Sequence, residues 1–235
     1  MRERTRWWLV VSYAAAMAWL EAATVVYLRR LLGRIEPYQP NPMPNDVGLV
    51  LTEVTREIAT MIMLFAVGGL AGRNWRSRLG YALVAFGVWD ILYYVFLKLI
   101  CGWPKSLFDW DILFLLPLPW WGPVLAPGLI AALMVLGGTL VSQHDSEAEP
   151  FWPARWSVGL SALGAVLALY VFMADTLHAA RRGEAAIRGV LPIRFNWWLF
   201  VPALALMGAP IIELGWRLRS RRDCPVFASA NPDPP

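Results

Sequence analysis

The sequence is poor in charged residues and in cysteine. Only 16% of its 235 residues are charged, against about 25% in soluble domains, which excludes an ordinary water-soluble globular protein. Its two cysteines, Cys101 and Cys224, are too few for a disulfide framework. The net charge of +4 does not indicate nucleic-acid binding, because the arginines flank apolar segments and do not form one basic face.

The sequence also lacks the short motifs that mark common active sites. It has no His-Glu-x-x-His zinc motif, no Gly-x-Ser-x-Gly nucleophile motif and no phosphate-binding glycine-rich loop. The nearest approach to the nucleophile motif lies between Gly159 and Gly164, around Ser161. Its spacing is wrong, and its small residues are typical of a helix-packing face.

Long apolar segments are what the sequence does contain. Hydrophobic residues make up 58% of the chain, and its 14 tryptophans fit a protein that meets bilayer interfaces. Several apolar segments reach the roughly 18–20 residues that cross a hydrocarbon core. We predict an all-α, polytopic transmembrane helix bundle, with one integral membrane domain over residues 1–222 and a disordered tail over 223–235. Its six spans are expected at residues 7–28, 50–72, 79–101, 120–141, 156–177 and 196–216.

Three connectors between these spans are long. Residues 29–46 contain four prolines, which favours an extended segment. Residues 102–127 are interrupted by prolines at positions 117, 119, 123 and 127, so we expect a re-entrant half-helix or an interfacial segment, with 112–119 as its apolar part. Residues 178–194 are predicted to form an interfacial amphipathic helix.

The distribution of Lys and Arg predicts the orientation. The basic first six residues resemble the start of a signal peptide, and we interpret residues 7–28 as a retained signal anchor. With both termini in the cytoplasm, eleven of the 21 Lys and Arg residues lie inside, including the compact clusters at 73–78 and 217–222. We therefore expect a bacterial-type inner (plasma) membrane and cytoplasmic termini.

Ionisable residues inside the spans are costly and by default indicate a functional site. At about 1.5 Å per residue, Glu21 and Glu57 lie roughly 10 Å below the outer ends of their spans, and Asp90 lies roughly 15 Å down its span. Carboxylates from several helices are thus expected in the outer half of the bundle. The candidate ligand- or ion-binding residues are Glu21, Glu53, Arg56, Glu57, Asp90, Tyr94, Lys98, Asp109, Asp111, Asp175 and His178.

Helical spacing gives some of these residues a common face. Glu53 and Glu57 are four residues apart. Asp90, Tyr94 and Lys98 also repeat every four residues, and such stripes face the interior of a bundle. In a purely structural alternative, Arg56 and Lys98 neutralise the carboxylates, and the polar groups only hold the helices together.

A cluster rich in carboxylate oxygens suits a hard divalent cation or a proton relay. The candidate metal ligands are Glu21, Glu57 and Asp90. A haem is not expected, because the two histidines, His144 and His178, are predicted on opposite sides of the membrane.

Three functions fit this pattern. The first is transport or ion coupling, in which a cavity in the outer half of the bundle binds a cation, a proton or a polar solute. The second is a membrane-embedded enzyme that acts on a lipid or isoprenoid, with a carboxylate as acid or base and Arg56 or Lys98 at an anionic head group. The third is an accessory or assembly subunit of a larger membrane complex, whose partners would be other membrane proteins or further copies of this chain.

Overall fold

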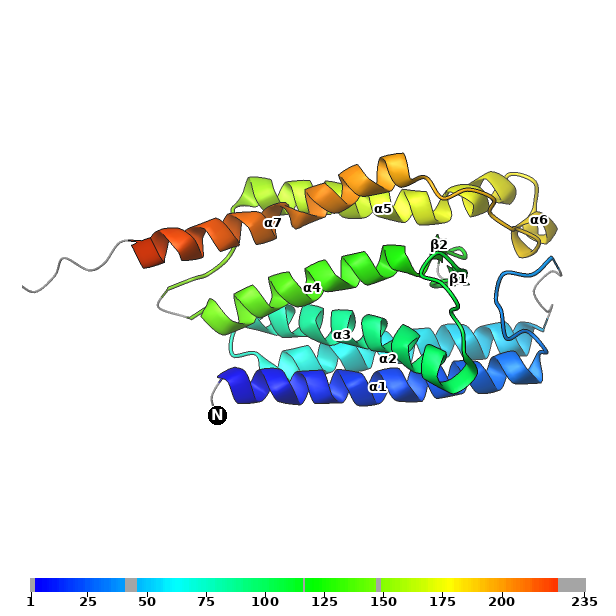
Figure 1. Ribbon diagram of the computed structural model, residues 1–235, viewed down its shortest axis with the longest axis horizontal. Helices are drawn as coiled ribbons and strands as arrows, with labels where there is room; N and C mark the ends of the chain where they lie inside the picture. The colour runs from blue at the N-terminus through cyan, green and yellow to red at the C-terminus, as the bar shows by residue number, and fades with distance from the viewer. Residues whose placement is uncertain (1–2, 41–45, 116, 147–148, 224–235) are drawn as a thin grey trace, which may run out of the picture.

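The computed structural model describes residues 3–40, 46–115, 117–146 and 149–223, and it consists almost entirely of helices (Figure 1). Six of these helices are long and apolar enough to cross a bilayer, which confirms the predicted all-α, six-span bundle. The elements are α1 (Glu3–Leu31), α2 (Val47–Ala71), α3 (Trp75–Cys101), β1 (Trp110–Ile112), β2 (Trp121–Pro123), α4 (Leu125–His144), α5 (Arg155–Ala180), α6 (Glu184–Arg188) and α7 (Trp197–Asp223). The tail predicted as disordered lies, from residue 224 onward, outside the described residues.

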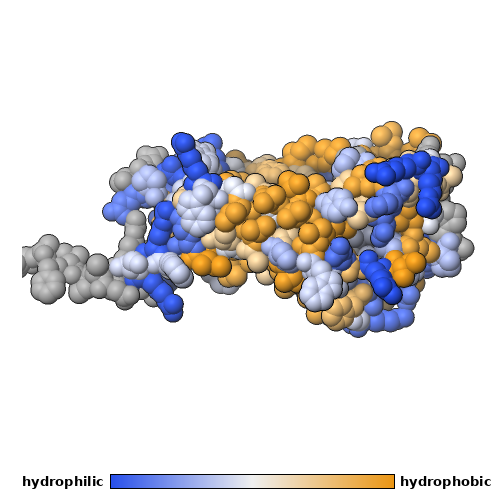
Figure 2. Space-filling model, turned by 90° about the horizontal axis from the view of Figure 1, so that it is seen from above, coloured by the Kyte–Doolittle hydropathy of each residue, from blue (hydrophilic) through white to orange (hydrophobic). Residues whose placement is uncertain are grey.

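The long helices run up and down, so their connections gather at two ends (Figure 1). We call the end that carries residues 32–40, 102–124 and 181–196 the hairpin end, because the two strands lie there. The opposite end carries the start of α1, the short turn between α2 and α3, and the end of α7. Viewed over α5 and α7, the middle of the molecule is covered mainly by apolar residues, and hydrophilic residues gather towards the ends (Figure 2). This is the surface that a bilayer requires.

Helix α3 lies at the centre of the larger half of the bundle and packs against α1, α2 and α4. Buried residues of α1, α2 and α3 form a common core that includes Ala14, Leu64 and Val84. Helices α5 and α7 form a second pair beyond α4 (Figure 1). Their core includes Phe172 of α5 and Phe200 of α7, and it also takes in Ala126 of α4.

Glycines set how closely the central helices approach one another. A Cβ at Gly87 of α3 would lie 2.5 Å from the carbonyl oxygen of Ala131 on α4, and one at Gly138 of α4 would overlap the carbonyl of Gly80 on α3. Small residues let membrane helices pack backbone against backbone, where dispersion replaces the missing hydrophobic effect. Gly164 of α5 meets Ala203 of α7 in the same way, as expected of a packing face around Ser161.

The proline-rich connector is a β-hairpin, so the expectation of a half-helix for this segment is wrong. Trp110–Ile112 and Trp121–Pro123 pair in antiparallel register, and α4 begins only at Leu125. Cross-strand bonds continue beyond the strands: Leu113 N donates to the Trp120 carbonyl at 2.8 Å, and Trp120 N donates to that of Phe114 at 2.9 Å. Proline cannot donate a helical hydrogen bond, whereas pairing with a neighbouring strand satisfies the remaining backbone groups at this depth.

The hairpin also joins the two halves of the bundle. Near its tip, the backbone N–H of Leu115 donates to the Glu57 carboxylate of α2 at 3.2 Å. On the other side, the hydroxyl of Thr176 on α5 donates to the carbonyl of Pro119 at 2.7 Å. Glu57 lies ten residues into α2, so the tip reaches about 15 Å below the start of that helix. The segment thus folds back beside α2 as a hairpin and not as a half-helix.

The predicted amphipathic helix over 178–194 is much shorter than expected. Helix α5 continues to Ala180, and α6 covers only Glu184–Arg188. Gly183 has a φ of 101°, which a helix cannot contain, and it separates the two helices. The residues after Gly189 have no regular structure up to α7.

We predict that cysteines placed in the hairpin connector and in the α4–α5 loop are labelled from opposite sides of the membrane. In a background without Cys101 and Cys224, Lys105→Cys and Glu149→Cys should each react with an impermeant maleimide from one side only, because α4 crosses the bilayer between them. Labelling of both variants from the same side would contradict the six-span topology.

We also predict that Gly138→Ala destabilises the protein, because its Cβ would push α4 away from α3. Overpacking of this kind costs about 1–3 kcal/mol. The matched control is Gly128→Ala on the same helix, since a Cβ there meets nothing within 4 Å. Thermal unfolding in detergent should show a lower midpoint for Gly138→Ala alone. Equal midpoints for the two variants would mean that the α3–α4 contact is looser than described.

Candidate functional site

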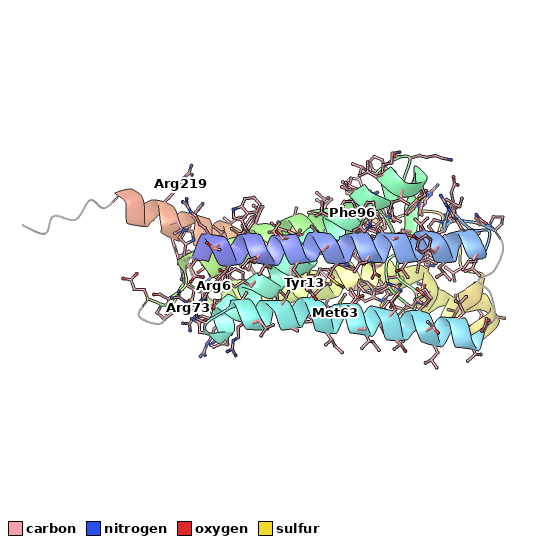
Figure 3. All side chains as sticks on the ribbon, turned by 90° about the horizontal axis from the view of Figure 1, so that it is seen from below. Arg6, Tyr13, Met63, Arg73, Phe96 and Arg219 are labelled. Atoms are coloured by element: carbon pink, nitrogen blue, oxygen red, sulfur yellow. The ribbon has the colours of Figure 1, made fainter. Side chains whose placement is uncertain are left out.

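A cavity of about 600 Å³ lies at the hairpin end, between α1, α2, α3 and the hairpin. Its apolar walls include Val25, Val54 and Leu113, and Ile187 of α6 lies at its edge. Helices α1 and α2, which both contribute to the lining, run side by side (Figure 3). Eight charged residues contribute to its lining: Glu21, Arg29, Arg34, Asp46, Glu53, Arg56, Glu57 and Asp111.

Arg56 of α2 connects two carboxylates across the helix pair. It forms an ion pair with Glu21 of α1, and its Nη2 lies 2.8 Å from Glu53 one turn earlier on α2. The hydroxyl of Thr60 donates a further hydrogen bond to Glu21 at 3.1 Å. Glu21 is buried, so this pairing is what allows its charge to lie inside the bundle.

A second ion pair joins α1 to the hairpin. The Nη2 atom of Arg29 lies 2.8 Å from Oδ1 of Asp111, whose side chain is only 1% exposed. The Arg29 guanidinium also stacks on the ring of Trp103, with its Cζ 4.4 Å from the ring centroid. The Arg29 cation and the Ile112 backbone N–H, which donates to Oδ1 of Asp111 at 2.9 Å, both stabilise the charged form of this buried carboxyl.

Several polar atoms of the cavity residues have no hydrogen-bond partner within the described part of the chain. They include Nη1 of Arg29, Oδ2 of Asp111 and Nε1 of Trp89, which are all buried. Nη1 of Arg56 also has no hydrogen bond, but it lies in the ion pair with Glu21. Leaving a buried polar group without a partner costs about 1–3 kcal/mol. Arg29, Asp111 and Trp89 of the cavity lining thus each carry a buried polar atom that has no hydrogen-bond partner among the described residues.

The structure brings five of the candidate residues predicted from the sequence to this cavity. They come from three elements that are distant in sequence, namely α1, α2 and β1: Glu21, Glu53, Arg56, Glu57 and Asp111. Asp90 and Tyr94 lie close behind, buried on α3, where both interact electrostatically with Asp111. Neither of these two residues lines the cavity.

The other four candidate residues lie elsewhere and have local contacts. Lys98 donates to the carbonyl of Pro104 at 2.7 Å beyond the end of α3, and Asp109 accepts the backbone N–H of Lys105 at 2.7 Å in a turn. Asp175 is exposed on α5. His178 is also exposed, and its Nδ1 lies 2.8 Å from the carbonyl of Ala174. None of these four residues lines the cavity, and Lys98 bonds to a backbone carbonyl instead of the carboxylate that the structural alternative gave it.

Sequence reasoning missed Arg29, which we had assigned to the first connector, and Trp89 and Tyr93 of α3. Helix α1 continues to Leu31, so Arg29 is still helical. The signal was present in the spacing: Glu21, Val25 and Arg29 follow one another at intervals of four and share a helix face. No spacing distinguishes Trp89 from the other tryptophans, because its place in the cavity depends on how α3 packs.

The described residues contain no group of three or more His, Cys, Asp or Glu side chains arranged to hold a metal ion. Glu21 is paired with Arg56, Glu57 accepts the Leu115 N–H, and Asp90 lies outside the cavity lining. A hard divalent cation therefore stays a prediction, and it draws no support from this geometry.

Comparison with known proteins does not assign the chain. No protein-family model matches it, and neither the curated proteins nor the solved structures contain a match.

We predict that Arg29→Gln destabilises the protein by about 3–5 kcal/mol, because it leaves the Asp111 carboxylate buried without its cation. The double variant with Asp111→Asn should regain most of that loss, since two neutral amides need no ion pair. Unfolding of both variants in detergent measures the difference. Lys105→Gln is the control, because its ion pair with Glu36 is exposed and its loss should leave the free energy of unfolding nearly unchanged. A double variant as unstable as the single one would show that Arg29 acts through contacts other than Asp111.

Proposed function

We propose that this multi-span membrane protein binds a polar ligand in the cavity at the hairpin end, as part of transport. The observation that carries the proposal is the set of buried polar atoms without partners on Arg29, Asp111 and Trp89. Residues whose only role is to hold helices together would pair their polar atoms with one another, as Arg56, Glu21 and Glu53 largely do. A ligand that accepts hydrogen bonds from Arg29 and Trp89 would supply the partners that the described residues do not provide.

The lining favours binding over catalysis. It includes no histidine, cysteine or serine among the described residues, and the hydroxyl of its threonine, Thr60, donates to Glu21. The carboxylates are mostly engaged, by Arg56, Arg29 or the Leu115 N–H. Transport needs only a site that binds and releases, and broken backbone beside such a site is typical of transporters.

The basic clusters near both ends of the chain support an orientation with the termini in the cytoplasm of a bacterial-type cell and the hairpin end outside. The ligand would then enter from the outer side of the inner membrane. Proline-broken backbone lies there, at the mouth of the cavity.

We predict that a cysteine at Val54, in the cavity wall, reacts with a charged, membrane-impermeant methanethiosulfonate from the hairpin side. The background again lacks Cys101 and Cys224. The matched control is Thr55→Cys, on the exposed face of the same turn of α2. Thiolates form poorly in an apolar environment, so the control should react roughly tenfold more slowly or worse. Equally slow reaction at both positions would show that polar molecules do not reach the cavity, and it would favour the accessory-subunit role.

A further inference from the structure

An apolar groove on α2 adjoins the cavity. It has a volume of about 520 Å³ and is lined by Ile58, Met61, Ile62, Phe65 and Ala66 of α2 and by Phe114 of the hairpin, with Glu57 at its upper limit. Glu57, Met61 and Phe114 line both the cavity and the groove, so the two adjoin each other at these residues. One molecule with a polar and an apolar part can therefore occupy both.

The cavity and the groove together form a site that is polar at one end and apolar at the other. On α2 the cavity residues begin at Asp46 and the groove residues extend to Ala66, so the polar part lies nearer the hairpin end. The groove runs from there towards the middle of the membrane-spanning helix. A phospholipid in the leaflet at the hairpin end has the same direction, with its head group outward and its acyl chains towards the bilayer centre.

The charges of the cavity restrict the head group. Three arginines and five carboxylates contribute to the lining, so a head group with only negative charge meets more repulsion than attraction. The buried donors on Arg29 and Trp89 suit phosphate oxygens. Glu57 lies where the cavity and the groove meet and has no ion pair among the described residues, so it suits a cation on the same molecule.

From this geometry we infer that the ligand is a zwitterionic phospholipid with an amine on its phosphate head group, such as phosphatidylethanolamine. The head group occupies the cavity and one acyl chain occupies the groove on α2. The inference rests on the proposed function and names its ligand class. It also implies that the phospholipid enters the site sideways from the bilayer, because the side chain of Ile62 in the groove is 63% exposed on the outer surface of α2.

The test uses photoactivatable phosphatidylethanolamine, with a diazirine in one acyl chain, in nanodiscs that hold the purified full-length protein. Cross-links should map to residues 58–66 of α2 and to Phe114. The matching phosphatidylglycerol probe, which is anionic, should label this region roughly tenfold less, which is the worth of one charge-assisted hydrogen bond. Equal labelling by both probes would mean that the groove holds bulk lipid, and it would overturn the inference.

Two variants examine the two parts of the site. Ile62→Trp fills the groove and should reduce labelling severalfold, whereas Val166→Trp, at a site 64% exposed on α5, should not. Trp89→Phe removes the indole N–H and also reduces the volume of a buried side chain, and it should reduce the preference for phosphatidylethanolamine. If Ile62→Trp and Val166→Trp behave alike, the groove is not a chain site.

A soluble head group separates this inference from the proposed function. Glycerophosphoethanolamine, which has no acyl chain, should protect Val54→Cys from the charged methanethiosulfonate if the cavity binds the head group. Protection without any acyl-chain cross-link on α2 would leave the polar-ligand function standing and overturn the lipid inference. Absence of reaction at Val54→Cys together with absence of cross-links would overturn both.

Discussion

The structure depends on one constraint, which is that a charge inside a bilayer must be neutralised where it lies. Arg56 meets this constraint for Glu21 and Glu53, and Arg29 meets it for Asp111. Each pair joins elements that are distant in sequence: α1 to α2 in the first case, and α1 to the hairpin in the second. Helix α1 is thus connected to both of its neighbours at the hairpin end, and the cavity lies between the three elements.

The same constraint applies to the backbone. The N–H and carbonyl groups of a helix form hydrogen bonds within that helix. The proline-rich connector is not helical, so its backbone groups form hydrogen bonds between its own two strands and to Glu57 and Thr176. A segment without a helix can therefore pack among the long helices with its backbone groups paired. The resulting hairpin places Asp111 and Leu115 against the cavity, where a transmembrane helix would have presented only side chains.

The sequence was sufficient to predict the six spans, because length and hydropathy alone decide whether a helix can cross a bilayer. It also identified Glu21, Glu53, Arg56, Glu57 and Asp111, because charged residues are rare enough in such segments to be noticed. The hairpin was not predictable in the same way, since strand pairing depends on contacts between residues some ten positions apart and not on local periodicity. Lys98 and Asp109 were predicted as site residues but have local contacts, at a helix end and in a turn. Their spacing in the sequence is the same as that of site residues, so the sequence could not distinguish the two cases.

The bond between Thr176 and Pro119 has a mechanical consequence. The hairpin is held from one side by Arg29 and Glu57 and from the other by α5, so it is a shared support for both halves of the bundle. Any movement that widens the cavity by displacing the hairpin must either break this bond or carry α5 along with it. Helix α5 packs backbone to backbone on α7 at Gly164, so a displacement of α5 would also move α7. An opening at the cavity would therefore shift the α5–α7 pair as a unit.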